Sequence, residues 1–531
     1  MSNDSSFEKR GEDTKDSVEH HEIAEKLDQS SHDPIDGLDT IELTKTGYYS
    51  WLVSITAGLG GVLFGYDTGI IAAVLIYIGG DLNTNLTAQD KELITSITSG
   101  GAFIGAIFAG FTADRYGRKI AIYVGCALFI IGAILQAAAF SLAQMVVGRL
   151  VVGFGVGSAA MIVPLYIAEV SPAKYRGRMI GLDNMSITGG QLVSYGVGAG
   201  FAHVTGGWRY MVGGGALPAI LLWILLLFCP ESPRQLILFG KHEAAKDVIR
   251  RIYPNGTEEE VENKVRLISW HVDQAKQMHE GKSQWWILKQ LYVIPANFRA
   301  LVSACGLMAI SQLTGFNSLM YYSPTIFAQI GFANPVAVGT IIAGVNFFFT
   351  FVNLLLVDRV GRRRILLCTV QFMGFFLIIA AVAFAHIPTT HDLKIVEGAS
   401  ITWQANLVLA SMICFVGFYS SGIGNTAWLS SEFFPMEVRS MGTMMMTMSC
   451  WGSNIIVAST FLTQMENTTP SGAFGFYAAI CIVGYVCIYF CYPEVAGLSL
   501  EDIRQIFSEG FGVKKASQIQ KEMKAQRISH A

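Results

Sequence analysis

An acidic residue stands inside one of the most apolar stretches of the chain. The stretch from Trp51 to Ile78 contains the motif LFGYDTG, which places Asp67 about two thirds of the way along it. This stretch is long enough to cross a bilayer, which takes about 20 apolar residues. We therefore expect Asp67 at membrane depth, where a carboxylate costs roughly 2.5 to 3.5 kcal/mol and usually has both a partner and a function.

The composition indicates a polytopic membrane protein. Of 531 residues, 52% are hydrophobic and 15% are charged, which is too apolar for a soluble protein of this length. Residues 1–46 differ from the rest, because they carry 13 acids and 5 bases, whereas the remainder carries 27 acids and 32 bases. We expect residues 1–46 to be a disordered, acidic cytosolic tail. They contain no apolar segment that would make a signal peptide.

Twelve apolar runs follow this tail, six on each side of a polar stretch. They lie near residues 48–78, 93–112, 120–140, 144–168, 183–203, 210–229, 300–330, 336–357, 365–386, 402–430, 440–462 and 472–492. The sequence thus predicts an all-α membrane protein with 12 transmembrane helices in two six-helix bundles. The predicted parts are a first bundle at 47–231, a helical cytosolic linker at 232–298, a second bundle at 299–494 and a cytosolic tail at 495–531.

Loop charges predict the orientation of these helices. Eleven basic residues fall in the short loops on one side and three on the other, which places both termini in the cytosol by the positive-inside rule. The glycosylation motifs at Asn85 and Asn467 then face outward, whereas the motif at Asn255 faces inward. We expect a glycosylated plasma-membrane protein that functions as a monomer.

The two halves of the chain repeat each other. DRYGRK at 114–119 returns as DRVGRR at 358–363, and YIAEVSPAKYRGR at 166–178 returns as WLSSEFFPMEVRS at 428–440. Glu169 and Glu231 are separated by 62 residues, as are Glu432 and Glu494. Such repetition is typical of two facing helical bundles with a binding site between them at mid-membrane.

The repeated motifs place acids and arginines together at the cytosolic helix ends. We expect them to pair when the inner ends of the two bundles are close, and so to form an inner gate; a set of merely topology-setting charges is the alternative. The gate residues are Asp114, Arg115, Arg118, Glu169, Arg176, Glu231, Asp358, Arg359, Arg362, Glu432, Arg439 and Glu494.

These motifs resemble the sugar porter family of the major facilitator superfamily. The resemblance covers roughly residues 47–510 and includes FGYDTG, DRYGRK, PESPR, QLTGFNSLMYYSP and SEFFPMEVR in the family's order. NSLMYYSPTIF, CWGSNIIVASTFL and YPEVAGLSLEDI most resemble the proton-coupled myo-inositol transporters of fungi. The resemblance implies a transporter of a small polyol or sugar.

A polyhydroxylated ring needs amide side chains, which both donate and accept hydrogen bonds, and an aromatic plate. Five residues at membrane depth offer these groups and match sugar-contacting positions in similar transporters: Gln191, Gln312, Asn317, Asn346 and Trp451. Hydrogen bonding between helices is the alternative role, above all for Asn346. Gly315 is expected to break its helix beside the site.

Further residues are candidates for the cavity or its gate. Tyr321 and Tyr322 are expected outer lids, with core packing as the equal alternative, and Trp428 is a candidate for the cavity wall. Two positions depart from the family: Ser311 replaces the first of two glutamines and would leave a gap or a water, and Ala427 precedes Trp428 where proline is usual.

The resemblance also gives Asp67 a partner. The family places Arg149, in GRLVVG, beside the acid of the first helix, and an unpaired arginine at that depth would be costly. The two are expected to meet and to couple transport to protons, with a purely structural ion pair as the alternative.

We therefore predict a secondary active transporter that carries myo-inositol with a proton. A facilitative or proton-coupled hexose transporter is the second hypothesis, and a nutrient sensor that hardly transports is the third. No nucleophile-base pairing or phosphate-binding loop is evident, so an enzyme is not expected. All nine cysteines lie in or beside apolar runs, without metal-ligand spacing. We expect no metal, cofactor or nucleic acid as a partner, only the substrate, the proton and the lipid bilayer.

Overall fold

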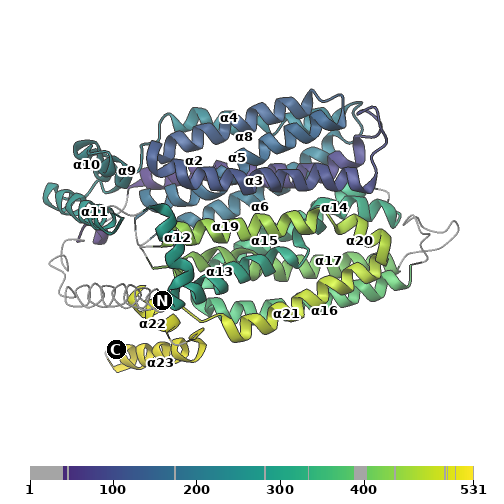
Figure 1. Cartoon of the computed structure of the whole chain (residues 1–531). Coiled ribbons are helices and arrows are strands. Elements are labelled where there is room, and N and C mark those ends of the chain that lie inside the picture. Colours follow the sequence, from purple (N-terminus) through teal and green to yellow (C-terminus); the bar gives the residue numbers. More distant parts are fainter. Residues whose placement is uncertain are drawn as a thin grey trace, which may run out of the picture.

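The computed structural model describes residues 40–44, 47–172, 175–279, 283–332, 334–387, 403–435, 438–495, 498, 500–508 and 510–529. In this part of the chain all regular elements are helices, and they form two halves that lie side by side (Figure 1). The first half contains α2 (Tyr48–Tyr77), α3 (Ala88–Tyr116), α4 (Arg118–Ala137), α5 (Leu142–Val170), α6 (Arg176–Phe201), α7 (Gly207–Gly213) and α8 (Ala216–Leu226).

The second half contains more interrupted helices. Its elements are α13 (Pro295–Leu313), α14 (Phe316–Gln329), α15 (Pro335–Val360), α16 (Arg362–Ala385), α17 (Trp403–Ser421), α18 (Ile423–Thr426), η2 (Ala427–Phe433), α19 (Arg439–Ala458), α20 (Phe461–Thr468) and α21 (Pro470–Cys491). The predicted break at Gly315 is confirmed: this residue has φ +84°, which favours glycine, and it separates α13 from α14. A second break at Gly422 separates α17 from α18.

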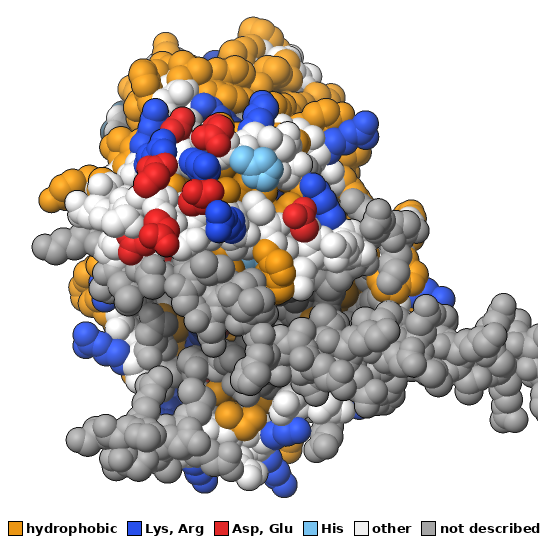
Figure 2. All heavy atoms as spheres, turned by 90° about the vertical axis from the view of Figure 1, so that its left-hand side faces the viewer, with side chains coloured by type: hydrophobic (Ala, Val, Ile, Leu, Met, Phe, Trp, Pro, Cys, Tyr) orange, Lys and Arg blue, Asp and Glu red, His pale blue; other side chains and the backbone are white. Residues whose placement is uncertain are grey.

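Short helices gather at one end of the two halves, which we call the linker end (Figure 1). They are η1 (Thr40–Leu43), α9 (Pro233–Leu238), α10 (His242–Ile252), α11 (Glu258–His279), α12 (Gln284–Val293), α22 (Leu500–Ser508) and α23 (Val513–Ser529). Figure 2 looks onto this end and shows basic and acidic side chains gathered over part of it. Ile41 of η1 is fully buried and Glu42 pairs with Lys264 of α11, so residues 40–44 of the acidic segment are folded onto the linker helices. Residues 1–39 lie outside the described part.

Ten helices or helix pairs among the described residues are long and apolar enough to cross a membrane. The predicted spans at α6 and α19 are not among them, because polar residues lower the mean hydropathy of both helices. Large apolar side chains such as Phe108, Leu217 and Phe228 are exposed on the sides of the halves. An apolar surface of this extent indicates contact with lipid rather than water.

Glycines bring α2 and α6 into close contact. Gly61, Gly65 and Gly69 recur every four residues on one face of α2, and a Cβ at Gly65 would lie 1.8 Å from the carbonyl oxygen of Ile187. Small residues at this spacing let helix backbones approach in membranes. The packing fixes the face of α2 that carries Asp67 relative to the face of α6 that carries Gln191.

Candidate binding cavity and buried ion pair

A cavity lies between the two halves. Its walls come from α2 and α6 of the first half and from α13, α14, α15, α17, α18, η2 and α19 of the second. The structure brings all five predicted contact residues, and Trp428, to this cavity: Gln191, Gln312, Asn317, Asn346, Trp428 and Trp451. These side chains are therefore observed to line one shared cavity. Their roles in binding remain predictions.

Gln191 and Asn346 form a bridge between the halves at the cavity wall. The Asn346 amide nitrogen donates to Oε1 of Gln191 at 2.7 Å, and the Ser420 hydroxyl donates to Oδ1 of Asn346 at 2.6 Å. These contacts fix the orientation of both amides. Among the described residues the Nε2 group of Gln191 donates no hydrogen bond, so it is left to face a ligand. Asn346 therefore links helices in this conformation and also lines the cavity.

A second set of amides surrounds Gln312. Its Oε1 atom accepts hydrogen bonds from Asn317 Nδ2 at 2.5 Å and from Asn454 Nδ2 at 3.1 Å. Its own Nε2 donates to the Ser311 hydroxyl at 3.3 Å and has a second hydrogen to offer. In the described residues Oδ1 of Asn317 accepts no hydrogen bond. This part of the cavity thus presents a donor and an acceptor side by side.

Aromatic rings close the cavity around these amides. Trp451 is 3% exposed and packs edge-on against Phe64 at 5.3 Å, and its buried indole N–H has no acceptor among the described residues. Phe316 and Tyr419 stack face to face at 3.7 Å. An unsatisfied buried donor is costly, so the Trp451 N–H is suited to a ligand oxygen.

The gap or water expected at Ser311 stays a prediction. Ser311 is buried, its hydroxyl donates to the Met308 carbonyl at 2.7 Å, and the Tyr419 hydroxyl lies within hydrogen-bonding reach of it. Tyr419 lines the cavity and Ser311 does not.

The sequence prediction missed several residues of the cavity. Asn184 and Asn425 also line it, and Asn425 donates to the Ser420 carbonyl at 2.6 Å beside the helix break. This bond satisfies a carbonyl group that the break leaves without a helical partner. Polar residues in apolar runs were the available signal, but the departure noted in this segment was Ala427 before Trp428, and Asn425 was not singled out.

Tyr321 and Tyr322 lie beside the cavity but do not line it. Tyr322 is fully buried, and its hydroxyl donates to the Ala458 carbonyl at 2.9 Å. Tyr321 is 4% exposed and lies on α14, which packs against α2. Both are packed in this conformation, and their proposed role as lids remains a prediction.

Asp67 and Arg149 meet, as predicted. Arg149 Nη1 lies 2.5 Å from Asp67 Oδ1, and the two side chains are 1% and 9% exposed. The Arg149 Nε group donates to the Ile94 carbonyl at 3.2 Å. The pair joins α2 to α5 within the first half, next to the cavity wall formed by Phe64 and Thr68. Its part in proton coupling remains a prediction.

At the linker end the repeated motifs form the same arrangement in both halves. Arg118 pairs with Glu169 at 3.0 Å in the first half, and Arg362 pairs with Glu432 in the second. Glu231 accepts from the backbone N–H groups of Arg118 and Lys119 at the start of α4. Glu494 accepts from the backbone N–H group of Arg363 at the start of α16. These acids therefore cap helix N-termini, which is a favourable place for a carboxylate.

The glycine of each motif has a physical reason. Gly117 and Gly361 have φ +106° and +96°, and a Cβ on either would lie 2.7 Å from a carboxylate oxygen of Glu231 or Glu494. Burial raises the pKa of the Glu231 carboxyl, while its backbone donors and Arg118 act in the opposite direction. The DRxGR motif thus makes a turn that lets a distant acid reach the next helix.

The expectation that these ion pairs form only when the two halves approach is wrong. Both described pairs join residues of the same half, because each arginine begins a helix next to the acid of its own bundle. Arg176 and Arg439 donate to the carbonyls of Ala168 and Phe434, also in their own halves. Arg115 and Arg359 are exposed. The side chains of Asp114 and Asp358 lie outside the described part.

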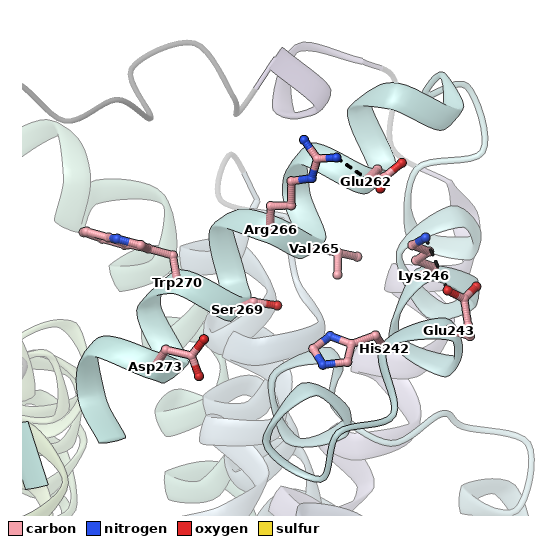
Figure 3. Close-up of a pocket in the computed structure, with 9 residues that line it drawn as sticks. All are labelled: His242, Glu243, Lys246, Glu262, Val265, Arg266, Ser269, Trp270 and Asp273. Carbon is pink, nitrogen blue, oxygen red and sulfur yellow. Dashed lines mark hydrogen bonds and ion pairs between the residues drawn. The ribbon is translucent and has the colours of Figure 1, made fainter. Parts of the chain in front are cut away.

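A second hollow lies between α10 and α11 at the linker end (Figure 3). Its walls carry two ion pairs within single helices, Lys246 with Glu243 and Arg266 with Glu262. None of the predicted contact residues lies there. Exposed pairs of this kind contribute little energy, and we assign no site to this hollow.

Comparisons with known proteins agree with this geometry. The profile of the family described as "Sugar (and other) transporter" matches residues 53–507. Myo-inositol transporter 1 of Cryptococcus neoformans is 43% identical over 479 residues, covering 90% of this chain and 84% of its own. Myo-inositol transporter 1 of Saccharomyces cerevisiae is 39% identical and covers 98% of this chain and 90% of its own.

Solved structures show the fold. The proton:xylose symporter XylE bound to 6-bromo-6-deoxy-D-glucose has a TM-score of 0.72 at 24% identity, covering 86% of this chain and 99% of its own. An inward open conformation of the xylose transporter XylE from E. coli has a TM-score of 0.70 at 24% identity and covers 86% of this chain and all of its own. The chain therefore has the major facilitator fold.

The buried pair generates a prediction about stability. Arg149→Gln leaves the Asp67 carboxylate buried without its cation, which destabilises by about 3 to 5 kcal/mol in comparable cases. Thermal unfolding of the purified protein in detergent should show a clear fall in the transition temperature, and adding Asp67→Asn to the variant should restore much of it. Arg266→Gln, which breaks an exposed pair on α11, is the matched control. An Arg149→Gln transition no lower than that of the control would contradict a tightly coupled pair.

Proposed function

The chain belongs to the sugar (and other) transporter family, and we propose that it carries myo-inositol across a membrane together with protons by alternating access. The named relatives are transporters, so the chain is a transporter rather than an enzyme. The choice of myo-inositol is supported by curated relatives with that name that are 37% to 43% identical over most of the chain. Proton coupling is supported by the pair of Asp67 and Arg149 beside the cavity.

The observation that best supports this function is a set of hydrogen-bonding groups in the cavity between the halves that have no partner among the described residues. Gln191 and Gln312 offer amide N–H groups, Trp451 offers its indole N–H, and Asn317 offers an amide oxygen. A cyclitol has a hydroxyl on every ring carbon, and each hydroxyl both donates and accepts. Groups from both halves would then contact one ring, which is what a site at the centre of an alternating-access transporter requires.

The finer architecture is part of the proposal. Adding α6 and the broken helix of α19 and α20 to the ten apolar spans gives twelve, six in each half. The linker end would face the cytosol with both termini and the helical domain of α9–α11, and the opposite end, with Asn85 and Asn467, would face outward. The protein would act as a monomer in the plasma membrane, with Asn85 and Asn467 as acceptors for glycans.

Contacts between the halves gather near the end away from the linker helices. Glu92 of α3 accepts from the backbone and hydroxyl groups of Thr463 at 2.8 and 2.6 Å, and the Tyr195 hydroxyl donates to the Met320 carbonyl. At the linker end the described ion pairs remain within each half. We infer that this conformation is closed to the outside and that the halves separate more readily at the linker end.

Protonation of Asp67 removes the charge that holds Arg149. A proton that moves inward gains about 2.3 kcal/mol per 100 mV of membrane potential and about 1.36 kcal/mol per pH unit. A gradient of about 100 mV and one unit thus supplies roughly 3.7 kcal/mol, enough for about a 500-fold solute gradient with one proton per solute.

The test of this function is uptake in cells that lack their own carriers. Cells that express the chain should accumulate radiolabelled myo-inositol above the external concentration, and an uncoupler should abolish the accumulation. Unlabelled myo-inositol should compete better than glucose at equal concentration. Equilibration without accumulation would indicate a facilitative carrier, and equal competition by glucose would overturn the assignment of myo-inositol.

Gln312 provides a test of the cavity. Gln312→Ala should leave a ring hydroxyl without a partner in a desolvated site, a loss of roughly 1 to 3 kcal/mol. The apparent affinity for myo-inositol should fall about five- to a hundredfold at a similar amount of protein in the membrane. Ser411→Ala is the control, because within the described residues this buried hydroxyl bonds only to the Leu407 carbonyl of its own helix, and it lies off the cavity. Unchanged affinity in Gln312→Ala would remove Gln312 from the site.

A further inference from the structure

Glu92 brings a charge across the boundary between the halves. It lies on α3, is 3% exposed, and accepts two hydrogen bonds from Thr463 of α20. The backbone N–H group of Thr463 donates to Oε1 at 2.8 Å, and its hydroxyl donates to Oε2 at 2.6 Å. The described ion pairs of the two bundles stay within one half, and other described hydrogen bonds across the boundary, such as that of Asn346 with Gln191, join neutral groups. Of the described contacts between the halves, that of Glu92 is therefore the charged one.

The contact caps the first turn of α20. This helix follows α19 after a break at Ser459 and Thr460, and Thr463 is its third residue. A backbone N–H group in the first turn of a helix has no acceptor inside that helix. Glu92 supplies the acceptor from the other half, and a carboxylate is favourable there because it meets the positive end of the helix dipole. Charge-assisted hydrogen bonds of this kind are roughly twice as strong as neutral ones.

Aromatic rings pack around the same turn. Phe461, the first residue of α20, is 1% exposed, and its ring lies 5.7 Å from that of Tyr322 and 5.7 Å from that of Tyr477. The Tyr322 hydroxyl donates to the Ala458 carbonyl at the end of α19, so its proton is already used. The carboxylate of Glu92 has thus exchanged water for the two donors of α20. An ionised group that loses its water needs such partners.

The place of this contact links it to the opening of the halves. α20 lies at the end away from the linker helices (Figure 1). When the halves part at this end, both hydrogen bonds of Glu92 break and its carboxylate returns to water. A protonated carboxyl is neutral and loses the charge assistance of these bonds. By linkage, ionised Glu92 favours the closed outer end and protonated Glu92 favours the open one.

We propose that Glu92 is a second proton-binding residue, which holds the outer end closed when it is ionised and releases it when it takes a proton from outside. The inference rests on the proposed alternating access with protons, and it gives Glu92 a task distinct from that of Asp67. Glu92 does not line the cavity, so it is a positioning residue that acts on access rather than on substrate contact. Acid outside the membrane thus promotes the step that admits substrate.

The titratable and charged groups near Glu92, on α3 and on the elements packed around this contact, are few. They are Asp90 and Lys91 of α3, Glu466 of α20, Arg149 of α5, Tyr322 of α14 and Tyr477 of α21. Asp90 caps its own helix through Thr87, and Arg149 is paired with Asp67. In the described part of the chain none of the six forms a hydrogen bond or an ion pair with Glu92. The contact with α20 therefore depends on the charge of Glu92 itself.

Hydrogen–deuterium exchange tests this contact directly, because the Thr463 N–H group is one of its donors. Purified full-length protein in nanodiscs, without substrate, is compared with Glu92→Gln at pH 7.5 and at pH 5.0. Comparison at equal pH cancels the intrinsic pH dependence of exchange. At pH 7.5 the first turn of α20 should exchange faster in Glu92→Gln than in the parent, by a factor within the range of about 5 to 150 typical of coupled sites. At pH 5.0, where the parent is itself protonated, the factor should fall below about twofold.

Controls separate this contact from general loosening. Asp90→Asn removes an acid two residues away that caps its own helix, and it should leave the exchange of α20 at the parental value at both pH values. α16, which belongs to the same half as α20, is the internal reference and should exchange equally in all variants. Thr463→Val removes only the hydroxyl donor and should give a smaller factor than Glu92→Gln at pH 7.5.

Two results would overturn the inference. One is equal exchange of the parent and Glu92→Gln at pH 7.5, and the other is a faster exchange that persists undiminished at pH 5.0, as a contact without a proton response would give. Neither result bears on symport, which the uptake experiment tests without reference to Glu92. If Glu92→Gln does not yield folded protein by size-exclusion chromatography, Thr463→Val decides: a factor at pH 7.5 that is lost at pH 5.0 supports the inference, and an unchanged factor contradicts it.

Discussion

The ion pair of Asp67 and Arg149 is the constraint on which the rest of the structure depends. A guanidinium at 1% exposure and a carboxylate at 9% exposure are stable in an apolar region only in contact with each other. That contact requires α2 and α5 to hold a fixed register, and the glycine face of α2 sets the register to α6 as well. The cavity wall formed by α2 and α6 is therefore placed by the same requirement that keeps the pair together.

Ion pairs hold helices together within each half, whereas neutral hydrogen bonds make most of the contacts between the halves. The described ion pairs of the repeated motifs, such as Arg118 with Glu169, join helices within one half. Most contacts across the boundary are neutral, as between Asn346 and Gln191. Neutral hydrogen bonds can be exchanged for water or substrate at a small net cost, about 1 kcal/mol, whereas separating buried charges costs more. This division suits two rigid halves that rock about a shared site.

The sequence predicted the features that depend on residue type and spacing. The amides that line the cavity, the break at Gly315 and the meeting of Asp67 with Arg149 are each visible as a polar or flexible residue in an apolar run. Pairing at the linker end was expected to depend on the approach of the two halves, because spacing shows which charges lie at one end but not which helix each acid reaches. Hydrogen bonds between side chains of different helices, such as that of Asn346 with Gln191, are visible only in three dimensions.

The most direct test of the account is transport by Asp67→Asn, which keeps the shape of the side chain but cannot titrate. Accumulation of myo-inositol and exchange of labelled for unlabelled myo-inositol are measured together in proteoliposomes with an imposed pH gradient. The account predicts that accumulation above equilibrium is lost while exchange continues. A variant that still accumulates myo-inositol and still moves protons with it would show that Asp67 is only a structural partner of Arg149.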